Sequence, residues 1–273
     1  MQAYANMALR AARRAGQIIV RAMDRVDLLT IEEKEKNDLV SEVDRRAEAA
    51  IVEILHKAYP EHRILGEESG QAVAGDPETT WIIDPLEGTR NYLHGIPHFC
   101  VSIGCIHRGR LEHGVVLDPL RDEAFVASRG HGAQLNGRRI RVTRRASLDG
   151  AVVGTGIPFR DVGDQLPAYL AMLEAVTRKA RGVRRAGSAA LDLAYVAAGR
   201  FDGFWELGLQ PWDLAAGVLL VTEAGGLVSD FAGGSAFLES GNVVCGSPKC
   251  FKALLQTIGP HVTRSMRPAA THA

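Results

Sequence analysis

Acidic side chains gather in four short segments of the sequence, and each segment adjoins an apolar run. The segments are KEKNDLVSEVD at 34–44, GEES at 66–69, DPLEGTRN at 84–91 and WDLAAG at 212–217. Each places carboxylates at the end of an expected strand or the beginning of an expected helix, where like charges repel unless cations lie among them. Carboxylate oxygens suit Mg²⁺, which keeps part of its water shell for a phosphate to replace. The segments therefore predict a magnesium site that binds phosphate.

A candidate phosphate cradle lies in the third segment. Gly88 and Thr89 follow an apolar strand and are expected to open a helix. Free N–H groups at the beginning of a helix bind phosphate oxygens. Metal ions held by carboxylates and facing such N–H groups form the arrangement that phosphoryl transfer requires.

Each acidic residue also has a simpler interpretation when it is taken alone. Asp44 could be a helix N-cap, and Asp213 could be a capping residue beside a core Trp. Glu67 and Glu68 are more often solvated charges, and Asp84 before Pro85 could mark only a turn. The order in which all four segments occur favours a common site over four separate structural roles.

The elements that must position these residues follow from the hydrophobic pattern. Helical spacing of apolar residues predicts a helix over 4–25 and a second over 43–55 that ends before Pro60, with a polar loop at 32–38 between them. Further helices are expected near 164–179, 187–199 and 213–224. Apolar runs predict strands at 81–83, where Asp84-Pro85 stops the strand, and at 99–106, 111–117, 124–127, 151–155, 203–206 and 226–230.

Two helices, then an antiparallel-looking sheet, then alternating elements predict a layered α/β protein. The sequence contains no repeat or flexible linker. Residues 1–273 are therefore expected to form a single unit, with a soft internal boundary near 145–150.

Charge gives little indication of a partner, because 32 Lys and Arg balance 32 Asp and Glu. Basic residues nevertheless form two clusters. These are Arg10, Arg13, Arg14, Arg21 and Arg25, and then Arg178, Lys179, Arg181, Arg184 and Arg185. The simpler interpretation is solvated helix faces, and the alternative is a contact surface for a protein or RNA partner.

Cysteine usage and hydropathy indicate a cytoplasmic protein. Cys100, Cys105, Cys245 and Cys250 form no CxxC pair and are expected to be buried free thiols. The Arg-rich N-terminal segment lacks the continuous apolar stretch of a signal peptide. No apolar run approaches the roughly eighteen residues that a membrane span needs, so no membrane partner is expected.

The acidic segments resemble those of the inositol monophosphatase family over nearly the whole chain. The family patterns GEE[ST], DP[IL]DGT[ST]N, WDxAAG and D-x-V-[ST]-x-x-D stand here as GEES, DPLEGTRN, WDLAAG and DLVSEVD. FRDVGD at 159–164, RRAGSAALDLAYVAAGRFDGFWELGL at 184–209 and AGGLVSDF at 224–231 resemble the bacterial SuhB-like branch in particular. The resemblance implies a five-layer αβαβα sandwich of the inositol monophosphatase and sugar phosphatase type, with Mg²⁺ as cofactor, inhibition by Li⁺ and a homodimer.

The resemblance also implies roles for individual positions. Glu67, Asp84 and the Leu86 carbonyl would bind a first metal ion, and Asp84, Glu87 and Asp213 a second, with a third and weaker ion near Glu67. Asp44 and Thr89, with Glu67 as a further catalytic residue, would orient and deprotonate the attacking water. Gly88 and Thr89 would bind the phosphate, while Ala189, Glu206 and Asp213 would contact the alcohol part of the substrate. Lys34 and Asp38 would support the first loop.

Two residues depart from the family pattern. Position 87 is Glu where the family has Asp, and the added methylene displaces the carboxylate by roughly 1–1.5 Å if the backbone stays fixed. Mg²⁺ tolerates poor geometry badly. Position 90 is Arg where Ser or Thr is usual, and this cation could bind an anion or compete with a metal ion.

Two functions follow from the resemblance and its departures. In the first, the chain is a Mg²⁺-dependent phosphatase that hydrolyses myo-inositol 1-phosphate or a similar small polyol phosphate. In the second, weak metal binding leaves a factor for ribosomal RNA antitermination that binds NusA and RNA polymerase. Family members also act on fructose 1,6-bisphosphate, histidinol phosphate or 3′-phosphoadenosine 5′-phosphate, and loops 157–165 and 205–211 are expected to select among substrates. Helix 164–179 and segment 184–209 are the expected dimer interface.

Overall fold

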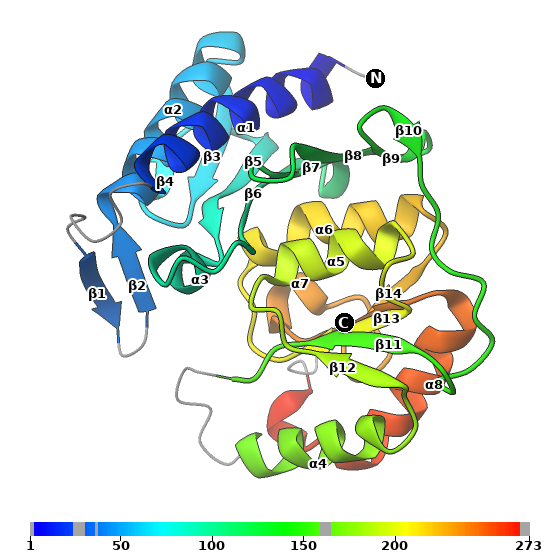
Figure 1. Ribbon diagram of the computed structural model, residues 1–273. Helices are drawn as coiled ribbons and strands as arrows, with labels where there is room; N and C mark the ends of the chain where they lie inside the picture. Colours follow the sequence, from blue (N-terminus) through cyan, green and yellow to red (C-terminus); the bar gives the residue numbers. More distant parts are fainter. Residues whose placement is uncertain (1–2, 24–30, 36–37, 159–164, 268–273) are drawn as a thin grey trace.

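The protein is a stack of five alternating helix and sheet layers (Figure 1). The computed structural model describes residues 3–23, 31–35, 38–158 and 165–267, of which the side chains of 31–40 and 71–72 are not described. The outermost layer holds α1 (Ala3–Ala22) and α2 (Glu42–Ala58). Both helices bury one apolar face, since residues three or four apart lie on the same side of a helix. As predicted, α2 ends before Pro60.

The second layer is a mixed sheet of eight strands in the order β10-β9-β8-β7-β6-β5-β3-β4. Its strands are β3 (His62–Gly66), β4 (Gly70–Val73), β5 (Asp76–Glu87), β6 (Cys100–His107), β7 (Arg110–Asp118), β8 (Glu123–Ser128), β9 (Gly132–Leu135) and β10 (Arg138–Arg139). The strands predicted near 99–106, 111–117 and 124–127 are confirmed as β6, β7 and β8.

The middle layer holds α5 (Ala189–Ala197) and α6 (Pro211–Glu223), which are buried on nearly all sides. The fourth layer is a five-stranded sheet in the order β12-β11-β13-β15-β14. Its strands are β11 (Val152–Thr155), β12 (Gly182–Arg184), β13 (Gly203–Glu206), β14 (Leu227–Ser229) and β15 (Val243–Gly246). The fifth layer holds α4 (Gln165–Thr177) and α8 (Pro248–Ile258) (Figure 1). The predicted αβαβα sandwich is confirmed.

Short elements complete the described part of the chain. They are the pair β1 (Ile31–Glu35) and β2 (Asp38–Ser41), the helices α3 (Thr89–Leu93) and α7 (Phe237–Ser240), and 3₁₀ turns at Gly259–His261 and Arg264–Met266. One hydrophobic cluster joins both sheets through α5 and α6, since it contains Ile82 and Phe125 of the large sheet and Phe204 and Cys245 of the small one. This shared core supports our proposal that the chain folds as one unit.

Two predictions about local structure are wrong. The loop expected at 32–38 is largely strand, because β1 and β2 pair antiparallel. The strand expected to stop before Asp84-Pro85 continues to Glu87, with its pairing to β6 shifted by a bulge between Asp84 and Glu87. A bulge tolerates proline because a residue there need not donate to the ladder.

All four cysteines are free and buried, as predicted. No helix among the described residues is both long and apolar enough to cross a bilayer.

Candidate active site

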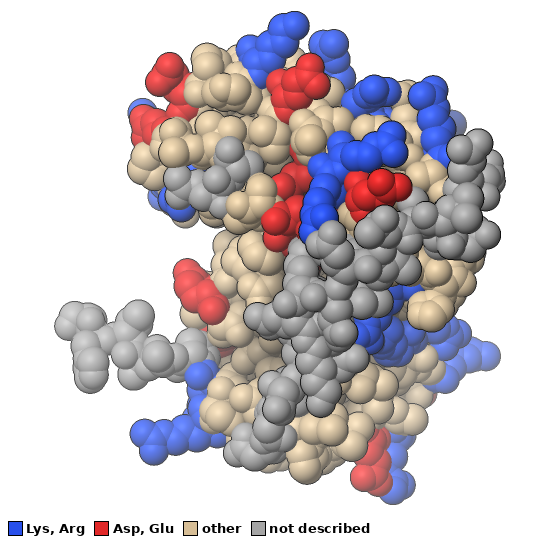
Figure 2. Space-filling model, turned by 90° about the vertical axis from the view of Figure 1, so that its left-hand side faces the viewer, with Lys and Arg blue, Asp and Glu red and all other residues tan. Residues whose placement is uncertain are grey.

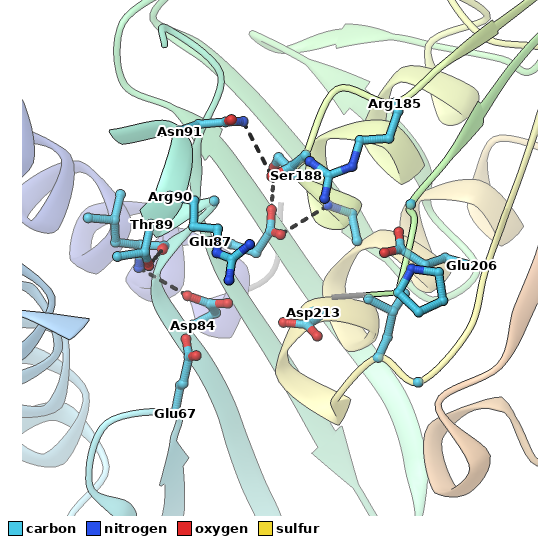
Figure 3. A pocket seen from close by; sticks show the side chains of 18 of the residues that line it. Glu67, Asp84, Glu87, Thr89, Arg90, Asn91, Arg185, Ser188, Glu206 and Asp213 are labelled. Carbon is cyan, nitrogen blue, oxygen red and sulfur yellow. Dashed lines mark hydrogen bonds between the residues drawn. The ribbon is translucent and has the colours of Figure 1, made fainter. Parts of the chain in front are cut away.

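A cavity of about 150 Å³ lies where the bulged end of β5 meets the beginnings of α5 and α6. Side chains of the second, third and fourth acidic segments line it together with residues from β13 and the loop before α5 (Figure 3). Among them are Glu67, Asp84, Leu86, Glu87, Gly88, Thr89, Arg90, Asn91, Arg185, Ser188, Ala189, Glu206 and Asp213. The structure thus brings together the predicted metal and substrate residues of three segments that are far apart in the sequence.

Asp44 is connected to this cavity through Thr89. The Thr89 hydroxyl lies 3.0 Å from Asp44 Oδ1 and 2.9 Å from the Leu86 carbonyl oxygen, and it can donate to either. The other oxygen of Asp44 accepts from the Ser41 N–H at 2.9 Å and from the Ser41 hydroxyl. Ser41 is the N-cap of α2 and Asp44 is the third helical residue of a capping box, so Asp44 is not itself the N-cap.

Burial raises the pKa of Asp44, although its hydrogen bonds from Ser41 and Thr89 act in the opposite direction. A carboxylate with a raised pKa is a better proton acceptor. The Asp44–Thr89 pair therefore has the geometry and the basicity to take a proton from a water in the cavity.

Asp84 is a buried carboxylate near the end of β5. It is 2% exposed, and burial followed by the charges of Glu67, Asp213 and Glu87 raises its pKa well above the usual range. Its Oδ1 accepts from the Leu86 N–H at 3.1 Å, which turns the backbone around the bulge. Buried like charges of this kind repel one another, and a cation among them would lower the free energy of the site.

Asp213 approaches the cavity from the first turn of α6. Its Oδ2 accepts from the Gln210 N–H at 2.8 Å and so completes a capping box, with Pro211 at the first helical position. Asp213 therefore has the capping role considered above and also lines the cavity.

Glu87 turns toward α5 rather than toward Asp84. Its Oε1 accepts from the Ala189 N–H at 3.0 Å, and its Oε2 accepts from the Ser188 hydroxyl (Figure 3). The Cys100 thiol is 3.7 Å from Oε2. Burial and then the charge of Asp213 raise the pKa of Glu87 to about 8, against the lowering effect of the Ser188 and Ala189 hydrogen bonds.

Two arginines line the same cavity as the carboxylates. Arg90, in the first turn of α3, extends its guanidinium into the space that Asp84, Glu87 and Asp213 surround (Figure 3). Arg185 approaches from the loop before α5, on the side of Glu206 (Figure 3). Burial and then the charges of Asp192, Glu87 and Asp213 raise the pKa of Glu206 well above its usual range, while Arg185 lowers it.

Two glycines make room for this arrangement. Gly88 has a φ of 92°, which side chains rarely adopt, and it precedes α3 as predicted. At Gly156, a Cβ would overlap the Glu206 carboxylate at 1.7 Å from Oε1. The site thus requires a residue without a side chain at both positions.

Several residues of the site were not predicted from the sequence. Asn91 donates to the carbonyl oxygens of His98 at 2.7 Å and Ala186 at 2.9 Å, and so joins the turn after β5 to the loop before α5. Ser188 and Gly156 were also missed, although Asn91 and Ser188 stand inside the quoted family segments. The side chains of Lys34 and Asp38 and the stretch 159–164 lie outside the described residues, so their predicted roles stay predictions.

The oxygen donors of the two predicted metal sites are oriented differently. Glu67, Asp84 and the Leu86 carbonyl offer the oxygen ligands of the predicted first metal site, and all three line the cavity. At the predicted second site both oxygens of Glu87 already accept hydrogen bonds from α5. Within the described part of the chain, no group of three or more His, Cys, Asp or Glu side chains converges as a ready-made metal site.

A carboxylate-lined cavity at strand ends of a five-layer sandwich is the class of site found in enzymes that hydrolyse phosphate esters. The chain belongs to the inositol monophosphatase family, whose sequence pattern matches residues 1–263. The predicted family is thereby confirmed.

Named relatives match almost the full chain. Nus factor SuhB of Pseudomonas aeruginosa is 58% identical over 270 residues, which cover 98% of this chain and 100% of that protein. The extragenic suppressor protein SuhB of Bartonella henselae superposes with a TM-score of 0.92 at 43% identity, covering 96% of this chain and 100% of that one. The inositol monophosphatase of Anabaena superposes with a TM-score of 0.82 at 36% identity, covering 93% and 94%. These relatives confirm the predicted SuhB-like branch.

Proposed function

We propose that this chain hydrolyses small phosphate monoesters, with myo-inositol 1-phosphate as the first candidate and Mg²⁺ as the cofactor. The observation that carries the proposal is the Thr89 hydroxyl, 3.0 Å from the buried Asp44 carboxylate and on the wall of the carboxylate-lined cavity. Membership of the family supports a phosphoric monoester hydrolase. The particular substrate is our inference.

Glu67, Asp84 and the Leu86 carbonyl would hold Mg²⁺. When bound, Mg²⁺ would polarise the phosphate and offset the repulsion among the carboxylates. The N–H groups of Gly88 and Thr89 would bind phosphate oxygens.

The proton of the attacking water would leave through Thr89. Because the Thr89 hydroxyl donates toward Asp44, its lone pairs can accept a hydrogen bond from a water in the cavity. Asp44 then receives the proton that Thr89 relays, which its raised pKa favours. Holding the water in line with the phosphate lowers the activation free energy, because the reacting groups are already oriented.

The alcohol part of the substrate would lie against α5 and β13. Ala189 and Glu206 line that side of the cavity, and Asp213 faces it from α6. A polyol hydroxyl can donate to Glu206, and Arg185 is close enough to influence that carboxylate.

A phosphate-release assay tests this function. Metal-stripped protein would be titrated with Mg²⁺ against inositol 1-phosphate, fructose 1,6-bisphosphate, histidinol phosphate and 3′-phosphoadenosine 5′-phosphate. We expect Mg²⁺-dependent release, fastest with inositol 1-phosphate. Absence of release at any Mg²⁺ concentration, with release restored by Glu87→Asp, would contradict the proposal for the native chain.

A second function is favoured by relatives that match the whole chain and are named Nus factors. We propose that this chain also acts in ribosomal RNA antitermination in the cytoplasm by binding NusA or RNA polymerase. The exposed face of α1 carries Arg10, Arg13 and Arg14, which form no ion pair with any other residue that the structure describes. Figure 2 shows basic side chains along the upper edge of the molecule, where α1 and α2 lie, with acidic ones between them.

Pull-down of NusA separates the two functions. The Asp213→Asn variant should lose phosphate release and still bind NusA. Alanine replacement of Arg10, Arg13 and Arg14 should weaken binding, while replacement of Arg178, Arg181 and Arg184 serves as the matched control from the other basic cluster. Failure of the native chain to bind NusA would count against this role.

We further propose that the chain forms the homodimer predicted from the sequence, through α4 and the exposed parts of the segment 184–209, since α5 within that segment is buried between the two sheets. Leu166 and Leu170 lie one turn apart on α4 and are 38% and 47% exposed. Exposed apolar side chains that lie together can mark a contact surface. Light scattering should give twice the chain mass, and Leu170→Glu should give a single chain mass. An unchanged dimer in that variant would place the interface elsewhere.

A further inference from the structure

The Glu87 carboxylate is held by hydrogen bonds from the beginning of α5. It accepts the Ala189 N–H at 3.0 Å, the Ser188 hydroxyl and the more distant Cys100 thiol. Ser188 is 1% exposed and Glu87 is 9% exposed, so these contacts are shielded from water. A rotation of Glu87 toward Asp84 would leave a buried hydroxyl and a buried N–H without their acceptor.

Arg90 extends into the space from which Glu87 has turned away. Its guanidinium points into the cavity among Asp84, Glu87 and Asp213 (Figure 3). A guanidinium is positively charged at every physiological pH and offers five donors in a fixed plane. Its positive charge is therefore permanent, and it can bind two phosphate oxygens at once.

We propose that Arg90 supplies the second positive charge of this cavity, so that each chain binds one divalent cation there and the guanidinium binds the substrate phosphate. The inference rests on the proposed phosphatase function for the phosphate contact, but the number of bound cations does not depend on it. Glu87 and Arg90 then act together. The longer carboxylate withdraws to α5, and the arginine occupies the space near Asp84 and Asp213.

The alternative is a second divalent cation held by Asp84, Glu87 and Asp213. It would require the Glu87 carboxylate to turn from α5 toward Asp84, and the ion would share the cavity with the Arg90 guanidinium.

Counting bound Mn²⁺ tests the inference. Mn²⁺ accepts the same oxygen ligands as Mg²⁺, and the free ion is measured by electron paramagnetic resonance in a titration of the metal-stripped full chain. We expect the native chain to bind one Mn²⁺ tightly. The Glu87→Asp, Arg90→Thr double variant should bind a second, with affinity about ten- to a hundredfold higher than any second site of the native chain.

Arg185→Thr is the matched control. It removes one positive charge from the same cavity but on the Glu206 side, so it should leave the Mn²⁺ count at one. Thermal unfolding by circular dichroism confirms that each variant is folded. Two comparable Mn²⁺ sites in the native chain would overturn the inference, as would a folded double variant that still binds one Mn²⁺ or a second ion gained in Arg185→Thr.

Failure of this inference and failure of the phosphatase function give different results. A chain that releases no phosphate but gains a second Mn²⁺ in the double variant retains the inference and loses the function. A chain that releases phosphate and binds two Mn²⁺ without substitution retains the function and loses the inference.

Discussion

Glu87 ends β5 and Thr89 begins α3 two residues later, yet their side chains contact opposite layers of the molecule. Thr89 contacts Asp44 of the outermost helix layer, and Glu87 contacts Ser188 and Ala189 of the middle layer. We call these the Thr89 side and the Glu87 side of the site. The Thr89 side matches the family pattern, whereas Glu87 departs from it.

The Thr89 side depends on a contact within one helix, whereas the Glu87 side depends on contacts between distant segments. On the Thr89 side, Asp44 is fixed by the capping box of its own helix, three residues from Ser41. On the Glu87 side, the carboxylate depends on donors about a hundred residues away in the sequence. One added methylene can therefore redirect Glu87 across a layer boundary, while Asp44, the proposed base, stays in place.

The largest effect is expected at Asp84, which both sides share. Asp84→Asn should lower phosphate release at least about a hundredfold, because even residues behind a metal ligand usually cost ten- to a hundredfold. The same change should raise the melting temperature of the metal-free chain by a few degrees, since the raised pKa of Asp84 means that its ionised form is unfavourable in the fold.

Asp118→Asn is the matched control for stability. Asp118 is also buried, but Arg121 lies 2.7 Å from its Oδ2 and two N–H groups donate to its Oδ1. Removing its charge should lower the melting temperature. If both variants shift the melting temperature in the same direction, repulsion around Asp84 is not what distinguishes the two sites.

Thr89→Val removes the hydroxyl that contacts Asp44 and leaves the contacts of Glu87 unchanged. Loss of the hydroxyl should lower kcat by about 10²–10⁴, because the relay from water to Asp44 is interrupted. Thr89→Ser keeps the hydroxyl and should stay within about tenfold of the native rate. The measurement is the initial rate of phosphate release at saturating Mg²⁺, and equal rates for Val and Ser would exclude the relay.

Asp192 lies one turn after Ser188 on α5, and its charge raises the pKa of Glu87. The pH dependence of the free energy of unfolding therefore tests the Glu87 side through Asp192. Burial raises the pKa of Asp192 from 3.8 to about 6, against the lowering effects of His98 and Arg185. A raised carboxyl pKa stabilises the fold below the unfolded pKa, and this contribution is lost as pH rises from about 4 to about 6. The loss is roughly 3 kcal/mol for a shift of this order.

Asp192→Asn should remove that part of the pH dependence. Urea unfolding at several pH values between 4 and 6.5 would show a free energy of unfolding that falls with pH in the native chain and stays flatter in the variant. Parallel curves for the two proteins would mean that Asp192 does not titrate in this range.

The elements on the Thr89 side could be predicted from local spacing, whereas the pairing of Thr89 with Asp44, 45 residues earlier in the chain, was predicted only from the resemblance to the family. The acidic segments, the helix after Gly88 and the second helix all follow from spacing and capping residues within a few positions. The layered fold was likewise predicted from the alternation of helices and strands. The capping role of Asp213 was foreseen as an alternative to a ligand, and the structure gives it that role while also placing it in the cavity.

The rest depends on contacts that spacing does not encode. The extension of β5 through Asp84-Pro85 requires a bulge against β6. The strand β15 and the helix α8 were missed, although Cys245 and Leu254 are fully buried in them. The turn of Glu87 toward Ser188 joins residues whose proximity only the packing of α5 on the large sheet creates. The departures at 87 and 90 were visible in the sequence, but their consequence was not.

The smallest effect is expected at Ser188, whose substitution tests the hydrogen bond that holds Glu87 against α5. Ser188→Ala removes one donor to Glu87 and should lower the free energy of unfolding at pH 7 by about 1–2 kcal/mol. The Ser188 hydrogen bond lowers the pKa of Glu87, which is about 8 in the native chain. Without it, the pKa of Glu87 rises further, and the decline in stability continues above pH 8, so the two proteins should differ more at pH 9 than at pH 7.

Ser102→Ala separates this effect from the loss of any buried serine. Ser102 is fully buried and donates to the Trp212 carbonyl oxygen at 3.0 Å, so its contribution should not change with pH. Urea unfolding of both variants in native and Glu87→Gln backgrounds gives the coupling energy between Ser188 and the carboxylate. Equal losses for the two serines at both pH values would mean that Ser188 contributes only packing, and Glu87 would then be free to turn back toward Asp84.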